Sequence, residues 1–194
     1  MKRLKDASRE KEFTKYVLLN DSKNYHAWQY RQWFVRKFDL FDGEIDYTNN
    51  LLLNDVRNNS AWNHRYYVMD KLNKLKDRNS DEFKKEIEFV VDKIRTAPNN
   101  ESSWNYLVGI LDGNLNENET VNRLIAEFDE SGEALSPFHY YFKLDQIILK
   151  LEENPDAELA KQAIDLTKSL ATVHDKIREK YWNYMSLKIK KKYL

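Results

Sequence analysis

Apolar residues recur at helical spacing through most of the chain. One stripe, with steps of mostly three or four residues, consists of Ala61, Trp62, Tyr66, Met69 and Leu72. The next consists of Phe83, Ile87, Val90, Val91 and Ile94, and it stops before Pro98, where helix propagation is disfavoured. Each stripe is the buried face of one amphipathic helix, so the pattern predicts consecutive helices.

A short sequence motif around a tryptophan, which we call the phrase, recurs along the chain. Trp28, Trp62 and Trp104 are separated by 34 and 42 residues, and Trp182 follows 78 residues later, about two repeats on. A period of this size is typical of stacked helical repeats. Because the tryptophan position recurs, we interpret it as part of the core.

The pattern predicts an all-α fold, an α–α superhelix in which antiparallel helical hairpins stack as a solenoid, because one hairpin cannot bury its own apolar face. We expect a single helical-repeat domain over 1–194. Its approximate repeats are 1–22 (partial), 23–56, 57–98, 99–133, 134–173 and 174–194 (partial). The apolar residues at 13–19 indicate a return helix without its first helix, so we expect a fragment of a longer subunit.

Composition supports helices and excludes several functions. The chain has only 4 Gly and 3 Pro in 194 residues, too few for the many turns of an all-β protein. A formal net charge of zero argues against nucleic-acid binding. No apolar run approaches the roughly 20 residues of a membrane span. The lack of cysteine is compatible with a reducing compartment, and we expect a cytoplasmic protein.

Other recurring positions have structural interpretations. Arg31 and Arg65 both stand three residues after a tryptophan, which favours an ion pair between repeats or a contact to a backbone carbonyl over a ligand contact. His64 corresponds to Tyr30 and Tyr106, so we expect a packed ring with a polar tip. No phosphate loop, nucleophile triad or metal-spaced cluster is present, which argues against a catalyst that acts alone.

The phrases resemble a known repeat motif. Residues 23–33 read Lys-Asn-Tyr-His-Ala-Trp-Gln-Tyr-Arg-Gln-Trp, and residues 56–66, 100–107 and 181–184 carry further, partly degenerate versions. This text resembles the repeats of protein prenyltransferase α subunits over nearly the whole chain. It is most similar to the α subunit shared by farnesyltransferase and type I geranylgeranyltransferase.

The resemblance implies a crescent of helical hairpins around a β subunit. The enzyme would move a farnesyl or geranylgeranyl group from its diphosphate to a cysteine near the C-terminus of a protein substrate. We expect no cofactor in this chain: the catalytic zinc is expected in the partner β subunit, and magnesium is allowed for the holoenzyme. This chain lacks cysteine, and its four histidines lie on different repeats.

The resemblance also implies roles at one helix start. Tyr25 and His26 would support catalysis near the isoprenoid diphosphate, and Lys23 and Asn24 would bind substrate. Asn24 has an alternative interpretation as a helix cap, and His26 has one as a local capping group. Asn59 replaces Tyr25 in the next phrase, so no shared packing role requires the tyrosine. A further lysine typical of the family would precede Met1.

Two functions remain open on the sequence. The first is a prenyltransferase α subunit that is inactive without β and serves as its support. The second is a helical-repeat scaffold that binds a protein or peptide without catalysis. The recurring Trp-x-x-Arg phrases and Asn-rich corners favour the first.

Overall fold

The structure is a computed structural model that describes residues 8–131 and 136–194. In these ranges the chain forms ten α-helices and no strand, which confirms the predicted all-α repeat fold. The helices are α1 (Ser8–Asn20), α2 (Tyr25–Lys37), α3 (Glu44–Asn54), α4 (Asn59–Lys71), α5 (Asp81–Thr96), α6 (Glu101–Leu111), α7 (Glu119–Glu130), α8 (Pro137–Glu153), α9 (Ala157–Ser169) and α10 (Glu179–Tyr193).

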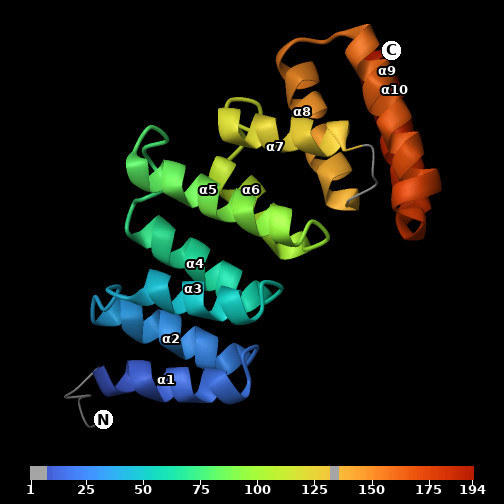
Figure 1. Cartoon of the computed structure of the whole chain (residues 1–194). Coiled ribbons are helices and arrows are strands. Elements are labelled where there is room, and N and C mark those ends of the chain that lie inside the picture. The colour runs from blue at the N-terminus through green and yellow to red at the C-terminus, as the bar shows by residue number, and fades with distance from the viewer. Residues whose placement is uncertain (1–7, 132–135) are drawn as a thin grey trace. The chain divides into compact units, whose positions relative to one another are not determined.

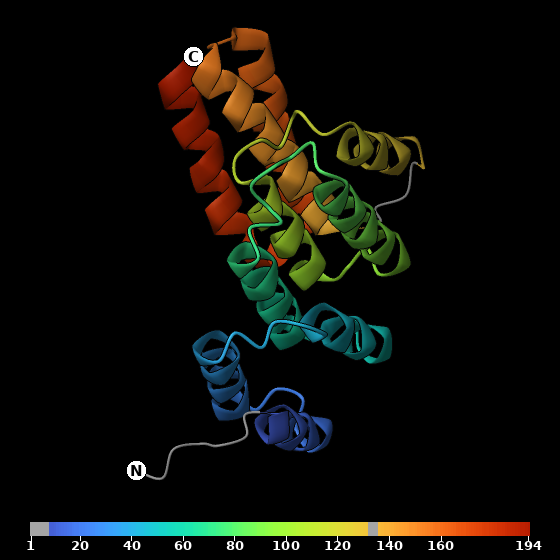
Figure 2. The same ribbon diagram turned by 90° about the vertical axis from the view of Figure 1, so that its left-hand side faces the viewer.

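The chain divides into two compact units, Met1–Glu86 and Ile87–Leu194. In unit 1, α1 packs on α2 and α3 packs on α4 (Figure 1). Figure 2 shows α2 and α4 in one layer of this unit and α1 and α3 in the other. The predicted repeat boundary between 133 and 134 lies outside the described residues, and the single domain stays a prediction.

Each tryptophan of the first three phrases closes the turn that precedes its own helix. The indole Nε1–H of Trp28, Trp62 and Trp104 donates to the carbonyl six residues earlier, at 2.9, 2.8 and 2.9 Å respectively. The rings themselves are at most 5 % exposed. The recurring tryptophan is therefore both a core residue, as predicted, and the hydrogen-bond donor that sets the shape of the turn.

An asparagine four residues before each of these tryptophans caps the helix. The side-chain oxygens of Asn24, Asn58 and Asn100 accept backbone N–H groups of the first turn at 3.0 to 3.3 Å. Such a cap satisfies donors that have no partner inside the helix. The cap and the indole hydrogen bond together explain why Asn-x-x-x-Trp recurs in the sequence.

The recurring arginines have a structural role, as predicted, although each ion pair lies within one of the predicted repeats and only further hydrogen bonds cross to the preceding one. Arg31 of α2 makes a two-pronged ion pair with Glu44 of α3, at 2.8 Å for both contacts, and also donates to Thr14 of α1. Arg65 of α4 pairs in the same way with Glu86 of α5, at 2.6 and 2.7 Å. All four charged side chains are buried. Each arginine thus joins a helix of one layer to helices of the other.

His64 completes the buried polar network around Glu44. Its ring is fully buried, as expected for a packed position, and its Nε2 lies 2.7 Å from Glu44 Oε2. Burial alone would raise the pKa of Glu44, but hydrogen bonds from His64 and Arg31 and the arginine charge lower it to about 2. Burial lowers the pKa of His64, so the neutral imidazole donates its Nε2–H to the carboxylate.

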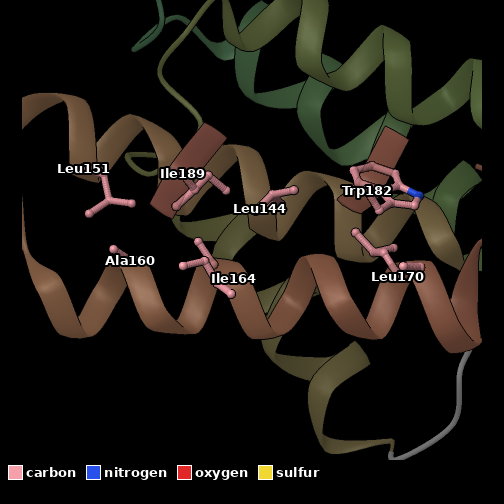
Figure 3. Close-up of a cluster of buried hydrophobic side chains, with 9 residues drawn as sticks. Leu144, Leu151, Ala160, Ile164, Leu170, Trp182 and Ile189 are labelled. Atoms are coloured by element: carbon pink, nitrogen blue, oxygen red, sulfur yellow. The ribbon is translucent and has the colours of Figure 1, made fainter. Parts of the chain in front are cut away.

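One hydrophobic cluster of unit 2 is packed between α8, α9 and α10 (Figure 3). Its members are small and branched apolar residues around one aromatic ring, including Leu144, Leu151, Ala160, Ile164, Leu170, Trp182 and Ile189. The indole of Trp182 donates to the carboxylate of Asp175 at 2.7 Å, where earlier tryptophans bond a backbone carbonyl. This last phrase therefore keeps the buried ring but builds its turn differently.

We predict that Trp62→Ala lowers the free energy of unfolding by roughly 3–5 kcal/mol, because it empties the volume of a large aromatic side chain that is 1 % exposed. Trp62→Phe should cost roughly 1–3 kcal/mol, since it removes the indole hydrogen bond to the Val56 carbonyl and part of the buried ring volume. Urea denaturation measures both values. A loss below about 1 kcal/mol for the alanine variant would contradict a core position.

We predict that acid destabilises unit 1 through Glu44 and His64. The pKa of Glu44 is lower in the folded chain than its ordinary value of 4.5, so its contribution is complete above about pH 5 and lost as pH falls toward 2. This contribution is on the order of 3 kcal/mol. The lowered pKa of folded His64 adds a loss below its ordinary value of 6.5, since the unfolded chain binds the proton first. Urea denaturation from pH 7 to pH 3 and a ¹³C NMR titration of the Glu44 carboxyl test this; a carboxyl that titrates at its ordinary pKa would contradict it.

Candidate functional site

The candidate site is the first turn of α2 with the residue before its cap, and we call Lys23–His26 the α2 corner. The turn before it is fixed on two sides. The Ser22 carbonyl accepts the Trp28 indole at 2.9 Å and the Asn58 amide at 3.4 Å, and the backbone N–H of Asn24 donates to the Asp21 carbonyl at 3.1 Å. Side chains at this corner therefore project from a turn held by α2 itself and by the cap of α4.

Tyr25 and His26 extend into solvent from the first two positions of α2. Tyr25 is 70 % exposed and His26 is also exposed. Their ring centroids lie 5.6 Å apart in an edge-to-face arrangement. Within the described part of the chain, neither the phenol nor the imidazole makes a side-chain hydrogen bond. Both groups are therefore free to bind a ligand.

Lys23 and Asn24 differ in how much of their side chains is available. Asn24 is the N-cap of α2, and its oxygen accepts the Ala27 N–H at 3.0 Å, so the cap interpretation is confirmed. Only its amide NH₂ remains as a donor for a ligand. Lys23 is exposed, and its ammonium forms no ion pair with the described residues. Its backbone N–H donates to Asp21 Oδ1 at 3.2 Å, which brings one carboxylate to the corner.

This arrangement suits an anionic ligand. The backbone N–H groups at the start of a helix carry partial positive charge and attract phosphate groups. The α2 corner adds an ammonium, a phenol and an imidazole to that start, and the first turn of α2 contains no acidic residue. The structure thus brings all four predicted site residues together on one turn.

The corresponding turns of the next repeats lack these donors. Asn59 and Ser60 occupy the places of Tyr25 and His26 at the start of α4, and Glu101 and Ser102 occupy them at the start of α6. The cap is common to all three turns, whereas the phenol and imidazole occur only at the α2 corner. The packing of the repeat therefore does not require them.

Sequence reasoning missed Glu44, the buried acid that fixes α2 through Arg31. A signal for it was present. Glu10, Glu44 and Glu86 follow one another at intervals of 34 and 42 residues, the same intervals that separate the first three tryptophans. Glu10 accepts the Tyr30 hydroxyl at 2.9 Å, as Glu44 contacts His64, so the repeated acid pairs with a repeated polar ring.

The described residues contain no group of three or more His, Asp or Glu side chains placed to hold a metal ion. Among the same residues, no helix combines the length and apolar character needed to cross a membrane.

Three comparisons identify relatives of the chain. The family model for the protein prenyltransferase alpha subunit repeat matches residues 7–38, 41–72 and 83–113. These segments correspond to the helix pairs α1–α2, α3–α4 and α5–α6, each with its tryptophan on the second helix. The family model therefore begins each repeat one helix earlier than the predicted ranges do. Both divisions describe the same series of helices, in which every second helix carries the tryptophan.

Two relatives are similar over different shares of the chain. The protein farnesyltransferase/geranylgeranyltransferase type-1 subunit alpha of Dictyostelium discoideum is 34% identical over 101 residues, which are 52% of this chain and 30% of that protein. A solved structure of Candida albicans protein geranylgeranyltransferase-I complexed with GGPP is 27% identical, with a TM-score of 0.79 over 95% of this chain and 59% of that one. The chain thus spans only part of each relative's length.

The repeated asparagine caps, indole-closed turns and bridging arginines agree with these matches in sequence and in fold. The chain belongs to the protein prenyltransferase α-subunit repeat family.

Proposed function

We propose that this chain forms repeats of the α subunit of a heterodimeric protein farnesyltransferase or geranylgeranyltransferase. The enzyme transfers an isoprenoid from its diphosphate to a cysteine near the C-terminus of a protein substrate, and it acts in the cytoplasm. The α chain supports the β subunit and contributes the α2 corner to the diphosphate side of the active site. Without β it transfers nothing.

The observation that carries this proposal is the pair of donors at the α2 corner. Tyr25 and His26 are exposed, lack partners among the described residues and stand on the first turn of a helix. The repeats of a prenyltransferase α subunit surround them, and the Candida relative is a geranylgeranyltransferase-I complexed with GGPP. A diphosphate is the kind of anion that such a corner suits.

The chemistry explains why neutral donors are useful there. When the bond between the isoprenoid carbon and the diphosphate oxygen breaks, negative charge grows on the leaving diphosphate. A phenol or imidazole N–H that strengthens its hydrogen bond at that moment stabilises the transition state more than the bound substrate. Lys23 and the α2 N-terminus contribute positive charge to the same place.

The metal chemistry is assigned to the partner. This chain has no cysteine, and its described residues offer no cluster of metal ligands. We propose that the catalytic zinc, which would lower the pKa of the substrate thiol, is bound by the β subunit. Magnesium in the holoenzyme is compatible with this proposal.

We predict that Tyr25→Phe and His26→Ala each slow the chemical step of the full heterodimer and affect peptide binding less. Loss of one neutral donor to the developing charge should cost about 1–3 kcal/mol, or roughly 5- to 150-fold in rate. Single-turnover kinetics with saturating lipid and peptide measure this step. Wild-type rates for both variants would reduce the corner to a structural turn.

Two variants serve as controls. Ser60→Ala changes the position that corresponds to His26 in the next repeat and should leave the rate unchanged. Asn24→Ala should lower the free energy of unfolding by about 0.5–2 kcal/mol, because it removes the cap of α2. Its single-turnover rate should stay close to that of the wild type, since the capping oxygen already has a partner within α2.

The partner is tested separately from the corner. The full-length protein should copurify with a prenyltransferase β chain when the two are expressed together, and the complex should bind isoprenoid diphosphate. Failure to copurify with farnesyltransferase-type and geranylgeranyltransferase-type β chains would favour the scaffold function instead. A stable complex with wild-type rates in the corner variants would keep the subunit assignment and reject the site.

A further inference from the structure

A groove in unit 2 has no part in the proposed catalysis. It encloses a volume of about 340 Å³ and is lined by the N-terminal halves of α6 and α8 and by the start of α10. On each helix the lining residues recur at steps of three or four, for example Phe138, Tyr141 and Asp145 on α8. We call it the α6–α8–α10 groove. Its volume is at the lower end of the range for ligand sites, roughly 300–1,000 Å³.

Aromatic rings form much of the groove wall. Phe138 and Tyr141 are half-buried and Tyr181 is 49 % exposed, so all three present surface to an occupant. Trp104 and Trp182 lie deeper, at 2 % and 4 % exposure, and border the groove with little accessible surface. The rings define a narrow site with apolar sides.

One carboxylate in this wall lacks a positive partner. Asp145 lines the groove and is exposed, and the described residues provide neither an ion pair nor a hydrogen bond to its side chain. The surrounding protein atoms raise the pKa of Asp145 to about 6 by desolvation. A cation placed beside it would stabilise the ionised form.

The guanidinium of Arg178 lines the groove but is already occupied. It donates to Asp175 Oδ2 at 2.7 Å and to the Tyr141 hydroxyl, and its carbon lies 4.7 Å from the centroid of the Tyr141 ring. The Glu101 carboxylate also acts on its charge. Arg178 therefore does not neutralise the charge of the Asp145 carboxylate. Its own contact with the Tyr141 ring shows that the aromatic wall of the groove can bind a guanidinium.

We propose that the α6–α8–α10 groove binds an arginine side chain of a partner protein, with its guanidinium against the Asp145 carboxylate and its stem between the aromatic walls. Charge complementarity carries the choice of a cation, because the carboxylates of Glu101 and Asp145 outnumber the single guanidinium of Arg178 among the lining residues. A guanidinium suits the site better than an ammonium, since it pairs with a carboxylate through two N–H groups and stacks on rings.

A protein segment fits better than a free small molecule because apolar surface continues beyond the groove. Tyr181, Tyr184 and Leu187 follow one another along α10 at steps of three, and they are 49, 61 and 67 % exposed. The first of them also lines the groove. Apolar residues next to the bound arginine would cover this stripe, and aromatic rings and arginine are enriched at the centres of protein interfaces.

The test uses the 194-residue chain and a capped peptide of sequence Leu-Ala-Arg-Ala-Leu, with two counterparts that carry citrulline or lysine in place of arginine. Indole ¹⁵N–H resonances report on binding. Trp104 and Trp182 should shift with the arginine peptide, whereas Trp28 and Trp62 of unit 1 should not. The neutral citrulline peptide should bind at least about tenfold more weakly, and the lysine peptide should fall between the two.

Asp145→Asn is the decisive variant. It should weaken the arginine peptide at least about tenfold and leave the citrulline peptide unchanged. The folded chain should be no less stable, since the wild-type carboxyl has a raised pKa and no partner to lose. Asp165→Asn removes an exposed charge from α9 outside the groove and should bind like the wild type. Equal binding of arginine and citrulline peptides, or wild-type affinity in Asp145→Asn, would overturn the proposal.

Discussion

The buried arginine–glutamate pair is the constraint on which the order of unit 1 depends. Arg31 is 3 % exposed and Glu44 is 1 % exposed, so neither charge can be hydrated. Removing one partner from such a pair typically costs 3–5 kcal/mol, and the Lys11 ammonium of α1 also contacts Glu44, at 3.1 Å. The pair is therefore satisfied only when α1, α2 and α3 meet in one register, and Arg65 sets the same condition for α3, α4 and α5. The Arg31–Glu44 pair therefore also fixes the position of α2 and of the α2 corner at its start.

Much of this arrangement could be predicted from the sequence. The helical stripes, the core tryptophans, the structural arginines and the cap role of Asn24 all depend on patterns within one repeat. The hydrogen bond from the Trp28 indole to the Ser22 carbonyl joins residues of one turn, so the residue pattern that produces it lies within seven residues of sequence. Recurrence of that signature identifies the repeat, and the repeat identifies the family.

Other features could not be read from the sequence, because they join residues that are far apart. Glu44 contacts His64 across 20 residues, and the α6–α8–α10 groove takes its walls from residues between 101 and 185. Asp145 belongs to an apolar stripe on α8, and nothing next to it in the chain indicates a carboxyl with a raised pKa. The roles of Tyr25 and His26 stay a prediction for a similar reason: the groups that they would serve belong to other molecules.

The turn before each of the first tryptophan helices has a further consequence. The connection has four residues in all three cases, at 21–24, 55–58 and 97–100. The interval between Trp62 and Trp104 nevertheless exceeds that between Trp28 and Trp62 by eight residues. Three of these lie in the connection after α4, which has nine residues against six after α2, and five lengthen α5 to 16 residues against 11 in α3. The extra residues thus lie in α5 and in the connection before it, and the turn before each tryptophan keeps its length. The two positions that correspond to Tyr25 and His26 can therefore differ between repeats without a change in the turn that holds them.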